Sequence, residues 1–423
     1  MSFCPKDTVI LGKTLPLPAM RLHRNLVEAV LLGLQQIFKD GVYADKAVER
    51  LLKSDKRWGK RDRAFVAETV YEIVRWKRLY AEIAEVREPF SREDWFRIFA
   101  VWAVLRGHAL PPWKEFAATP HRRIKGRFDS LKGIRKVRES IPDWLDELGE
   151  ESMGATLWEA ELAALNQPAP VVLRTNTLKT TPAALAQALQ AEGFAASPLP
   201  GYPAALQLAE RGNVFATKAF AEGWFEVQDA SSQRVAPLLG VEPGMRVIDC
   251  CAGAGGKTLH LAALMENKGQ IVAMDIYPNK LHELKRRARR AGAFNIETRL
   301  LDSPKVLKRM QGSADRVLID APCTGLGVLR RNPDAKWKLQ PEFVASVCRT
   351  QAELLQQYSK LVKPGGKMVY ATCSILPQEN SQQVTAFLAS EAGKDFRLVE
   401  EHPIYASESG FDGFYLSLME RAG

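Results

Sequence analysis

Strand-like and helix-like segments alternate along the last part of the chain, from about residue 223 to residue 423. This alternation predicts an α/β domain in which a mostly parallel, doubly wound sheet carries helices on both faces. The expected strands are 246–249, 270–275, 295–302, 316–320, 367–372, 396–400 and 413–419, and the expected helices are 258–265, 278–291, 341–362 and 378–391. Lys363-Pro-Gly-Gly366 is expected to separate helix 341–362 from strand 367–372.

Reactive side chains stand where the expected strands end. They are Asp249, Asp275, Asp302, Asp320 and Cys373. In open α/β sheets, ligands bind beyond the carboxyl ends of the parallel strands. The shared placement therefore predicts that these residues border one site.

The turn after the first strand, residues 251–258, has the sequence Cys-Ala-Gly-Ala-Gly-Gly-Lys-Thr. A phosphate-binding P-loop needs glycine where Cys251 stands, and a dinucleotide fingerprint needs its third glycine where Thr258 stands. What remains is a flexible turn that a ligand can approach closely. S-adenosylmethionine needs such a turn for its amino-acid part. It also needs an acid at the end of the next strand for its ribose hydroxyls, and Asp275 is placed there.

Two cysteines follow neighbouring strands: Cys323 in Asp320-Ala-Pro-Cys, and Cys373 in Ala-Thr-Cys-Ser. Their thiols are therefore expected to lie close together. A thiolate that adds to carbon 6 of cytosine activates carbon 5 for methylation, and a base must then remove the carbon 5 proton before the cysteine leaves. Asp320, near N3, would stabilise this adduct by hydrogen bonding. Chemistry alone does not rank the two thiols.

The remaining cysteines predict little chemistry. For Cys4 and Cys348, the favoured interpretation is a small buried apolar side chain. The chain has no Cys-x-x-Cys pair, so no zinc or other metal site is expected.

Taken together, these motifs resemble the Sun family of RNA cytosine-5 methyltransferases, in the bacterial RsmB/Fmu branch that acts on small-subunit ribosomal RNA. The residues that carry the resemblance are Val227-Gln-Asp-Ala-Ser-Ser232, 249–258, Asp275, Asp302, Asp320-Ala-Pro-Cys-Thr-Gly325, Thr372-Cys-Ser374 with Glu379-Asn380, and Asp412-Gly-Phe414. They occur in the expected order through residues 223–423. The resemblance implies a Rossmann-like class I methyltransferase domain.

The resemblance also implies roles for single residues. Cys373 would be the nucleophile, favoured by the presence of Thr372-Cys373-Ser374, and Cys323 would help to release the methylated RNA. The family usually has proline where this chain has Ala254, so the loop loses a fixed backbone angle. The implied S-adenosylmethionine site consists of Cys251, Ala252, Gly253, Ala254, Gly255, Gly256, Lys257, Asp275, Asp302 and Asp320.

The upstream residues predict two further domains. Apolar stripes indicate helices, with Leu26, Val30, Leu34 and Ile37 on one face. Ser91 and Asp94 resemble a capping box. Segment 61–76 resembles the NusB-like RNA-binding domain of the same branch, and segment 172–176 resembles its small linking domain. The predicted domains are an all-α NusB-like domain (1–145), a small α/β linking and RNA-binding domain (146–222) and the catalytic domain (223–423).

Basic residues outnumber acidic ones by 59 to 49, which gives a net charge of +10. This excess favours a nucleic-acid partner and a solvated basic surface about equally. Runs 53–63, around Trp58, and 122–138 are candidates to follow a phosphate backbone while stacking a base. Helix 280–290 offers further phosphate contacts through Lys280, Lys285, Arg286, Arg287, Arg289 and Arg290. For each run the alternative is a solvated face.

The function predicted is methyl transfer from S-adenosylmethionine to carbon 5 of a cytosine in RNA, with 16S ribosomal RNA as the first choice of substrate. Methylation of transfer RNA, and a non-catalytic role in ribosome assembly, are the alternatives. No stretch approaches 18 apolar residues, so no membrane span is expected. Residues 1–20 do not resemble a secretory signal, and a cytoplasmic monomer is expected.

Overall fold

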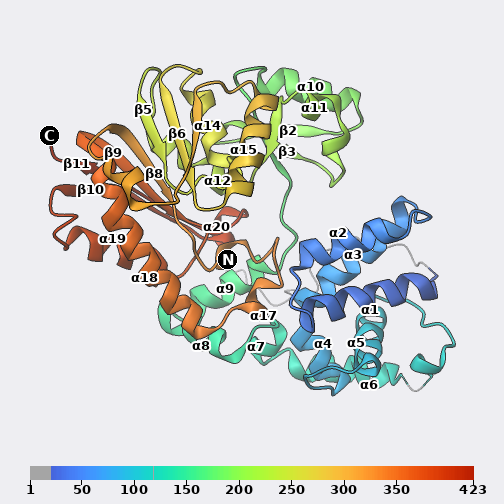
Figure 1. The fold of residues 1–423 in the computed structure, drawn as a ribbon. Helices are drawn as coiled ribbons and strands as arrows, with labels where there is room; N and C mark the ends of the chain where they lie inside the picture. Colours follow the sequence, from blue (N-terminus) through green and yellow to red (C-terminus); the bar gives the residue numbers. More distant parts are fainter. Residues whose placement is uncertain (1–20, 118) are drawn as a thin grey trace, which may run out of the picture. The chain divides into compact units, whose positions relative to one another are not determined.

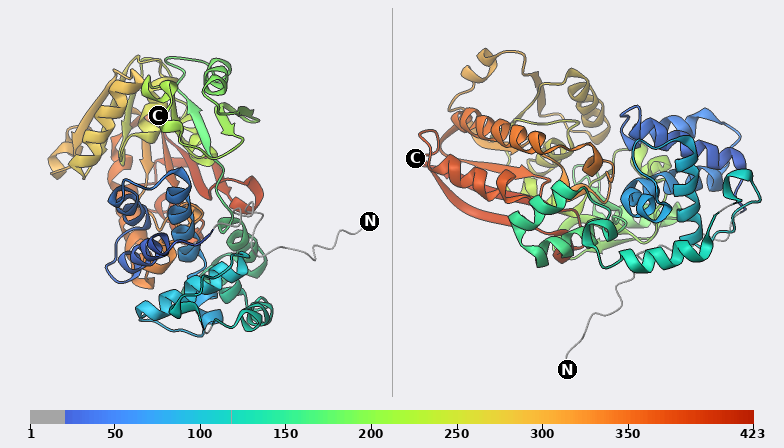
Figure 2. Two further views of the ribbon diagram at one scale, coloured as in Figure 1. Left: turned by 90° about the vertical axis from the view of Figure 1, so that its right-hand side faces the viewer. Right: turned by 90° about the horizontal axis from the view of Figure 1, so that it is seen from below.

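The structure, a computed structural model, describes residues 21–117 and 119–423 (Figures 1 and 2). The expectations for residues 1–20 and for Cys4 lie outside these ranges. The described chain divides into two compact units. The first contains the residues up to Pro168 together with Leu329–Gln340, and the second contains Ala169–Val328 and Pro341–Gly423. Within the described ranges, no helix has both the length and the apolar character needed to cross a membrane.

The first unit is helical. Its α1 stripe is buried as predicted, with Leu26, Val30, Leu34 and Ile37 at most 2% exposed. Ser91 caps α5 by accepting a hydrogen bond from the Asp94 backbone, which confirms the capping box. The elements are α1 (Arg24–Phe38), α2 (Ala44–Ser54), α3 (Lys60–Arg75), α4 (Lys77–Ala84), α5 (Arg92–Leu105), η1 (Lys114–Phe116), α6 (His121–Leu131), α7 (Arg135–Arg138), α8 (Asp143–Met153), α9 (Ala155–Leu165) and α17 (Ala335–Lys338).

The segment Leu329–Gln340 belongs to this helical unit, although the residues on both sides of it in sequence belong to the second unit. Its Trp337 indole donates a hydrogen bond to the Val74 carbonyl (2.7 Å). Asp334 is 3% exposed, and its carboxylate accepts bonds from the Ala44 backbone and Lys338, both at 3.0 Å. These bonds satisfy polar groups on both the segment and the helices.

A small antiparallel sheet begins the second unit, in the order β2-β3-β1-β4. Helix α10 starts with Pro182, and the Thr181 side chain caps it by accepting a hydrogen bond from the Ala184 backbone (3.2 Å). Strand β4 lies beyond residue 222 and pairs with β1. The elements are β1 (Val172–Thr175), α10 (Pro182–Ala191), β2 (Ala196–Leu199), β3 (Tyr202–Leu208), η2 (Val214–Ala216), α11 (Lys218–Ala221), β4 (Phe225–Val227), α12 (Ala230–Gln233) and α13 (Val235–Leu238).

The larger sheet has the order β10-β11-β9-β8-β5-β6-β7. Strands β5 to β9 pair in parallel, whereas β11 runs antiparallel to β9 and β10. This arrangement confirms the predicted doubly wound, mostly parallel sheet. The elements are β5 (Arg246–Asp249), α14 (Gly256–Leu264), β6 (Gln270–Asp275), α15 (Pro278–Ala291), β7 (Ile296–Leu300), α16 (Pro304–Lys308), β8 (Ala314–Asp320), η3 (Leu326–Val328), α18 (Pro341–Tyr358), η4 (Ser359–Leu361), β9 (Val362–Thr372), η5 (Pro377–Glu379), α19 (Ser381–Leu388), β10 (Phe396–Ile404), α20 (Ala406–Ser409) and β11 (Phe414–Arg421).

Each face of this sheet buries its own apolar cluster, because successive strand residues point to opposite sides. Val247 packs with Leu259 of α14 and Leu284 of α15 on one face. Its neighbour Ile248 packs on the other face with Leu355 of α18 and Phe387 of α19. Figure 1 shows these helix pairs on either side of the strands. Burial on both faces leaves the strand ends as the place for a site.

One sequence expectation needs correction. Lys363-Pro-Gly-Gly366 lies inside β9 and does not separate that strand from α18. The pairing with β8 shifts register between Ala314 and Arg316, which accommodates the proline and glycines.

Candidate active site

The two cysteines meet beyond the ends of β8 and β9. The register pairs Asp320 with Ala371, so Cys323 and Cys373 follow the same point of the sheet edge. Their sulfur atoms lie 3.3 Å apart, which confirms the expected closeness. The hydrogen bond with Cys373, followed by burial and the charges of Cys373 and Glu379, raises the pKa of Cys323 well above its usual value. Cys323 therefore keeps its proton and can donate a hydrogen bond to Cys373.

Backbone contacts fix the turn that carries Cys373. Gly327 in η3 donates to the Cys373 carbonyl (2.9 Å), and Gly413 donates to the Gly327 carbonyl (2.8 Å). A Cβ at Gly327 would overlap the Gly413 carbonyl oxygen and approach that of Cys373. This close approach of three chain segments requires glycine at position 327.

An ion pair stands beside the thiols. The Lys257 ammonium, at the start of α14, lies 2.7 Å from the Asp320 carboxylate at the end of β8. Burial opposes the charge on Lys257, but the charge and hydrogen bond of Asp320 outweigh burial and raise the lysine pKa. The ammonium also lies 5.4 Å from the centre of the Phe414 ring. Asp320 is thus held at the sheet edge by a fixed cation.

The glycine loop is held by Asp275. One carboxylate oxygen accepts a hydrogen bond from the Gly253 backbone and the other from the Tyr277 backbone, both at 2.8 Å. Gly255 has φ +87°, and a Cβ there would lie 2.6 Å from Leu284 Cγ, so only glycine fits. The next residue begins α14, which leaves backbone N–H groups directed at the loop.

The carbonyl groups of the loop are held by arginines that the sequence did not single out for this role. Arg287 donates to the Ala254 carbonyl (2.8 Å) and forms an ion pair with Glu226 of β4 (2.9 Å). Arg174 of β1 is buried and donates to the Gly256 carbonyl (2.6 Å). Ala254 stands where the family that the sequence resembles usually has proline, and here a side chain from α15 holds its carbonyl group.

The other predicted acids have different surroundings. Asp302 is exposed, two residues past β7, at the sheet edge away from the cysteines. Asp249 is 1% exposed and accepts a hydrogen bond from the Thr258 hydroxyl (2.7 Å). Burial raises the pKa of Asp249 to about 7, although the Thr258 bond opposes the shift. Asp275 is thus bonded to the glycine loop and Asp320 to Lys257, whereas Asp302 lies past the end of β7.

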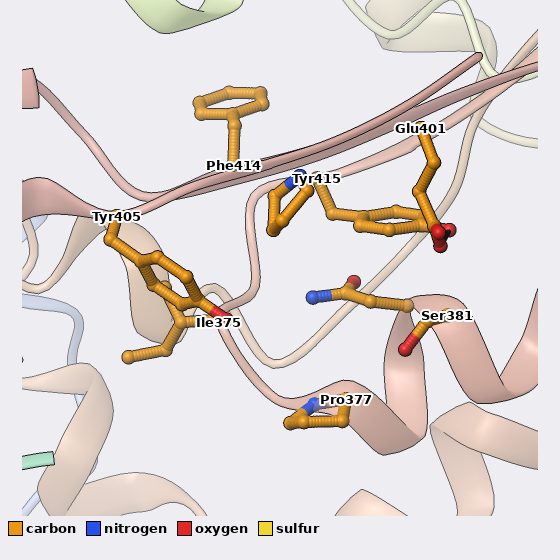
Figure 3. Close-up of a pocket in the computed structure, with 9 residues that line it drawn as sticks. Ile375, Pro377, Ser381, Glu401, Tyr405, Phe414 and Tyr415 are labelled. Atoms are coloured by element: carbon orange, nitrogen blue, oxygen red, sulfur yellow. Dashed lines mark hydrogen bonds between the residues drawn. The ribbon is translucent and has the colours of Figure 1, made fainter. Parts of the chain in front are cut away.

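A cavity of about 170 Å³ lies next to the cysteine turn but does not include either thiol (Figure 3). Ile375, two residues after Cys373, lines it together with Tyr405 and Phe414. Tyr415 donates a hydrogen bond to Glu401 in its wall. Its lining contains apolar and aromatic surface, whereas Cys323 and Cys373 are not part of it.

The structure changes the interpretation of two basic runs. Trp58 is 8% exposed and packs in the helical core, so the expectation that it stacks a base is wrong. In helix α15, Arg287 and Arg290 are held by Glu226, at 2.9 and 2.5 Å. The candidates for phosphate contact that remain exposed in this helix are Lys280, Lys285, Arg286 and Arg289.

Family comparisons agree with this geometry. Residues 236–415 match the family described as 16S rRNA methyltransferase RsmB/F. Residues 141–215 match the ferredoxin-like domain of RsmF/B-like methyltransferases. The helical first unit fits the NusB-like domain that its sequence resembles. The ferredoxin-like match includes strands β1 to β3 of the small sheet, and the methyltransferase match includes strands β5 to β10 of the larger sheet.

Individual relatives extend the match. The probable ribosomal RNA small subunit methyltransferase B of Synechocystis sp. is 33% identical over 396 residues, covering 85% of this chain and 88% of that protein. The ribosomal RNA small subunit methyltransferase B of Vibrio cholerae is 36% identical over 291 residues, covering 67% of this chain and 66% of that protein.

Solved structures show the same fold. The crystal structure of PH0851 covers 95% of this chain and 100% of its own, with a TM-score of 0.79 and 25% identity. A methyltransferase homolog from Pyrococcus horikoshii covers 68% of this chain and 97% of its own, with a TM-score of 0.60 and 26% identity. Together with the Synechocystis match, which spans most of both proteins, these findings show that the chain belongs to the RsmB/F family of 16S rRNA methyltransferases.

Proposed function

We propose that this chain methylates carbon 5 of a cytosine in 16S ribosomal RNA through a covalent adduct with Cys373. Its cofactor is S-adenosylmethionine, as membership of a methyltransferase family implies. The observation that supports the cysteine mechanism most directly is the pair of thiols 3.3 Å apart at the sheet edge. The Lys257–Asp320 ion pair stands beside them.

The residues at the strand ends suit this reaction. The Cys373 thiolate forms a bond to carbon 6 of the ring, and the electrons of the 5,6 double bond move towards carbon 5 and N3. N3 takes a proton from solvent as the adduct forms, and the Asp320 carboxylate, oriented by Lys257, accepts a hydrogen bond from N3–H and stabilises the adduct. After carbon 5 has gained its methyl group, a base removes the carbon 5 proton, the double bond re-forms, Cys373 leaves as a thiolate and N3 returns its proton to solvent. Cys323 assists this release.

The cofactor supplies an electrophilic methyl group. The loop from Cys251 to Lys257 fits its amino-acid part, because Gly253 and Gly255 adopt positive φ angles (+54° and +87°) that leave the backbone open to a ligand. The start of α14 can face its carboxylate. Asp275 and Asp302 are the acids proposed for the polar groups of its nucleoside, and Asp320 would border the reacting end.

The substrate and the domain roles remain proposals. The printed names of the Synechocystis and Vibrio relatives favour small-subunit ribosomal RNA over transfer RNA. Looped RNA lets a base leave the stack at low cost. We also propose that the protein is a cytoplasmic monomer with a NusB-like domain (1–145), a linking domain (146–222) and a catalytic domain (223–423). A non-catalytic assembly factor is the competing function.

Methyl-group tracing tests the reaction and its substrate. The protein is incubated with methyl-labelled S-adenosylmethionine and unmodified 16S ribosomal RNA, with transfer RNA and duplex DNA as controls, and the products are digested to nucleosides. We expect label in 5-methylcytidine from ribosomal RNA alone. Label only in transfer RNA would change the substrate, and cofactor binding without label in any RNA would favour the assembly factor.

Two cysteine variants separate the steps. Cys373→Ala should abolish both methylation and any covalent protein–RNA complex. Cys323→Ala should still form the adduct but release product slowly, so that a protein–RNA complex resistant to denaturation accumulates on a gel. The opposite pattern, with the complex trapped by Cys373→Ala, would exchange the two roles.

A further inference from the structure

The carboxylate of Glu379 lies between the two turns that carry the cysteines. We propose that Glu379 is a positioning residue whose carboxylate joins these turns and so holds the Cys323 and Cys373 thiols face to face. This inference rests on the proposed function, because it assigns the reason for that alignment to adduct formation and release. Glu379 is 0% exposed, so its role is internal to the site.

The contacts of Glu379 reach the residue that follows each cysteine. Its Oε2 accepts from the Thr324 backbone N–H (2.8 Å), and its Oε1 accepts from the Thr324 hydroxyl (2.5 Å). The Ser374 hydroxyl donates to the same Oε1. Thr324 and Ser374 also lie in contact through their hydroxyl oxygens at 3.2 Å. One side chain therefore fixes both turns immediately beside the thiols.

The donor pattern suits a carboxylate. Gln351 of α18 adds a fourth bond, from its amide nitrogen to Glu379 Oε2 (3.1 Å), and the same nitrogen donates to the Pro322 carbonyl (2.9 Å). A buried charge is costly unless hydrogen bonds replace its water. Here both oxygens accept, and only a carboxylate offers two oxygens that are acceptors alone.

The next residue strengthens the same connection. Asn380 donates to the Ser374 carbonyl (3.0 Å) and accepts from the Thr372 hydroxyl (2.5 Å). The Tyr370 hydroxyl donates to the Glu379 carbonyl (2.7 Å). Residues 379 and 380 are thus bonded to β9 and to the turn after it, so the backbone that carries the Glu379 side chain is held in place.

The negative charge of Glu379 also acts on Cys323. The Cys323 pKa is raised mainly by the Cys373 hydrogen bond, burial and the Cys373 charge, and the Glu379 charge raises it further. This charge helps Cys323 to remain a protonated donor to Cys373. Glu379 therefore affects both the position of the two thiols and the pKa of Cys323.

Two substitutions at Glu379 separate shape from charge. Glu379→Ala removes every acceptor and should free the turns. Glu379→Gln keeps the shape of the side chain and removes its charge. The new amide NH₂ can donate to the Thr324 and Ser374 hydroxyls, because hydroxyl groups can rotate to accept. The amide oxygen can still accept from the Thr324 N–H. Glu353→Ala, exposed on the same helix as Gln351, is the matched control.

Disulfide formation by diamide measures the alignment without RNA. The two thiols lose two protons and two electrons to diamide, an S–S bond forms and diamide is reduced to its hydrazine; peptide mass spectrometry follows the Cys323–Cys373 product. We expect Glu379→Ala to slow this reaction about tenfold or more, because misplaced reacting atoms lose effective concentration. Glu379→Gln and Glu353→Ala should stay within about threefold of the unmodified protein.

The pH dependence of Cys323 alkylation tests the charge of Glu379, because a purely structural role of Glu379 would leave that dependence unchanged. The rate of Cys323 alkylation by iodoacetamide should reach half its maximum at lower pH in Glu379→Gln, because a negative charge has been removed. Fast disulfide formation in a folded Glu379→Ala protein would overturn the proposal, as would an unchanged Cys323 profile in Glu379→Gln.

Folding and catalysis are controlled separately. Should Glu379→Ala fail to fold, Thr324→Val and Ser374→Ala each remove one donor and should each slow disulfide formation by a smaller factor; unchanged rates in both would overturn the proposal. If the unmodified protein forms the disulfide but leaves cytosine unmethylated, the proposed function fails while the positioning of the thiols still stands.

Discussion

At the scale of single residues, Asp249 is a carboxyl group whose pKa is raised by burial. It ends β5, and Thr258 supplies its hydrogen bond while its other oxygen is buried. Its pKa of about 7 lies above the ordinary value of 3.8. A raised pKa means that the folded protein binds the proton more tightly than the unfolded chain does. The stability from this group is therefore full below pH 3.8 and is lost as the pH rises through 7.

The Asp249→Asn substitution tests this sign. Asparagine does not titrate, so only the unmodified protein loses stability from this group as the pH rises. The difference in unfolding free energy between the variant and the unmodified protein should therefore grow in favour of the variant by about 2 kcal/mol from pH 5.5 to pH 8. The measurement is hydrogen exchange of β5 and β6 amides at both pH values. Asp315→Asn is the control, because burial of Asp315 is outweighed by the Lys363 ion pair and the Arg246 backbone bond, which lower its pKa below 3.8. Asp315 is therefore ionised throughout this pH range in the folded and the unfolded protein, and its variant should show no pH trend. An equal pH trend in both variants would contradict the assignment.

At the scale of secondary-structure elements, α15 and β4 together brace the glycine loop. Arg287 connects the Ala254 carbonyl to Glu226, and Arg290 shares that carboxylate. Proline at position 254 would restrict the backbone by its ring. This chain has alanine there, and Arg287 donates a hydrogen bond to its carbonyl. A proline ring and the Arg287 hydrogen bond would restrict the same loop, so their effects on cofactor affinity should not be additive.

A double-mutant cycle measures the overlap. Arg287→Ala should weaken S-adenosylmethionine binding about tenfold in the natural loop but only about threefold in an Ala254→Pro background, because proline lowers the freedom of the unbound loop. Isothermal calorimetry gives both constants. Arg289→Ala, exposed on the same helix, should change affinity less than about twofold. Equal losses in both backgrounds would show that the arginine does not brace this turn.

At the scale of the whole molecule, the chain passes between its two units at residues 168–169, 328–329 and 340–341. The last two crossings enclose Leu329–Gln340, which begins six residues after Cys323. Within the helical unit, the Trp337 ring packs against the core, and the Lys77 ammonium lies over it, 4.2 Å from the ring centre. The helical unit thus includes a segment that follows Cys323 closely in the sequence.

Trp337→Ala should destabilise the helical unit by about 2 kcal/mol, since it removes partly buried aromatic surface and the bond to Val74. Faster hydrogen exchange in α1 and α3 would report the change. Phe343→Ala, 47% exposed just beyond the segment, serves as the control and should leave that exchange unchanged. Identical exchange in both variants would mean that the segment adds no stability.

The sequence by itself determined the elements whose pattern is local. Strands 246–249 and 270–275 and helix 278–291 have the predicted bounds, because apolar periodicity and turn residues mark them. It also predicted that Cys323 and Cys373 meet, since neighbouring parallel strands end at one edge. The α1 stripe and the Ser91 cap follow from equally short patterns.

Only the tertiary structure decided which side chains those elements would bury or join. Trp58 lies in the core although basic residues surround it in the sequence. Glu379 joins Thr324 and Ser374, and Arg287 reaches both Ala254 and Glu226. These contacts connect residues that are as many as 61 positions apart. Local periodicity fixes the face of a helix or strand, but the partner on that face depends on how distant elements pack.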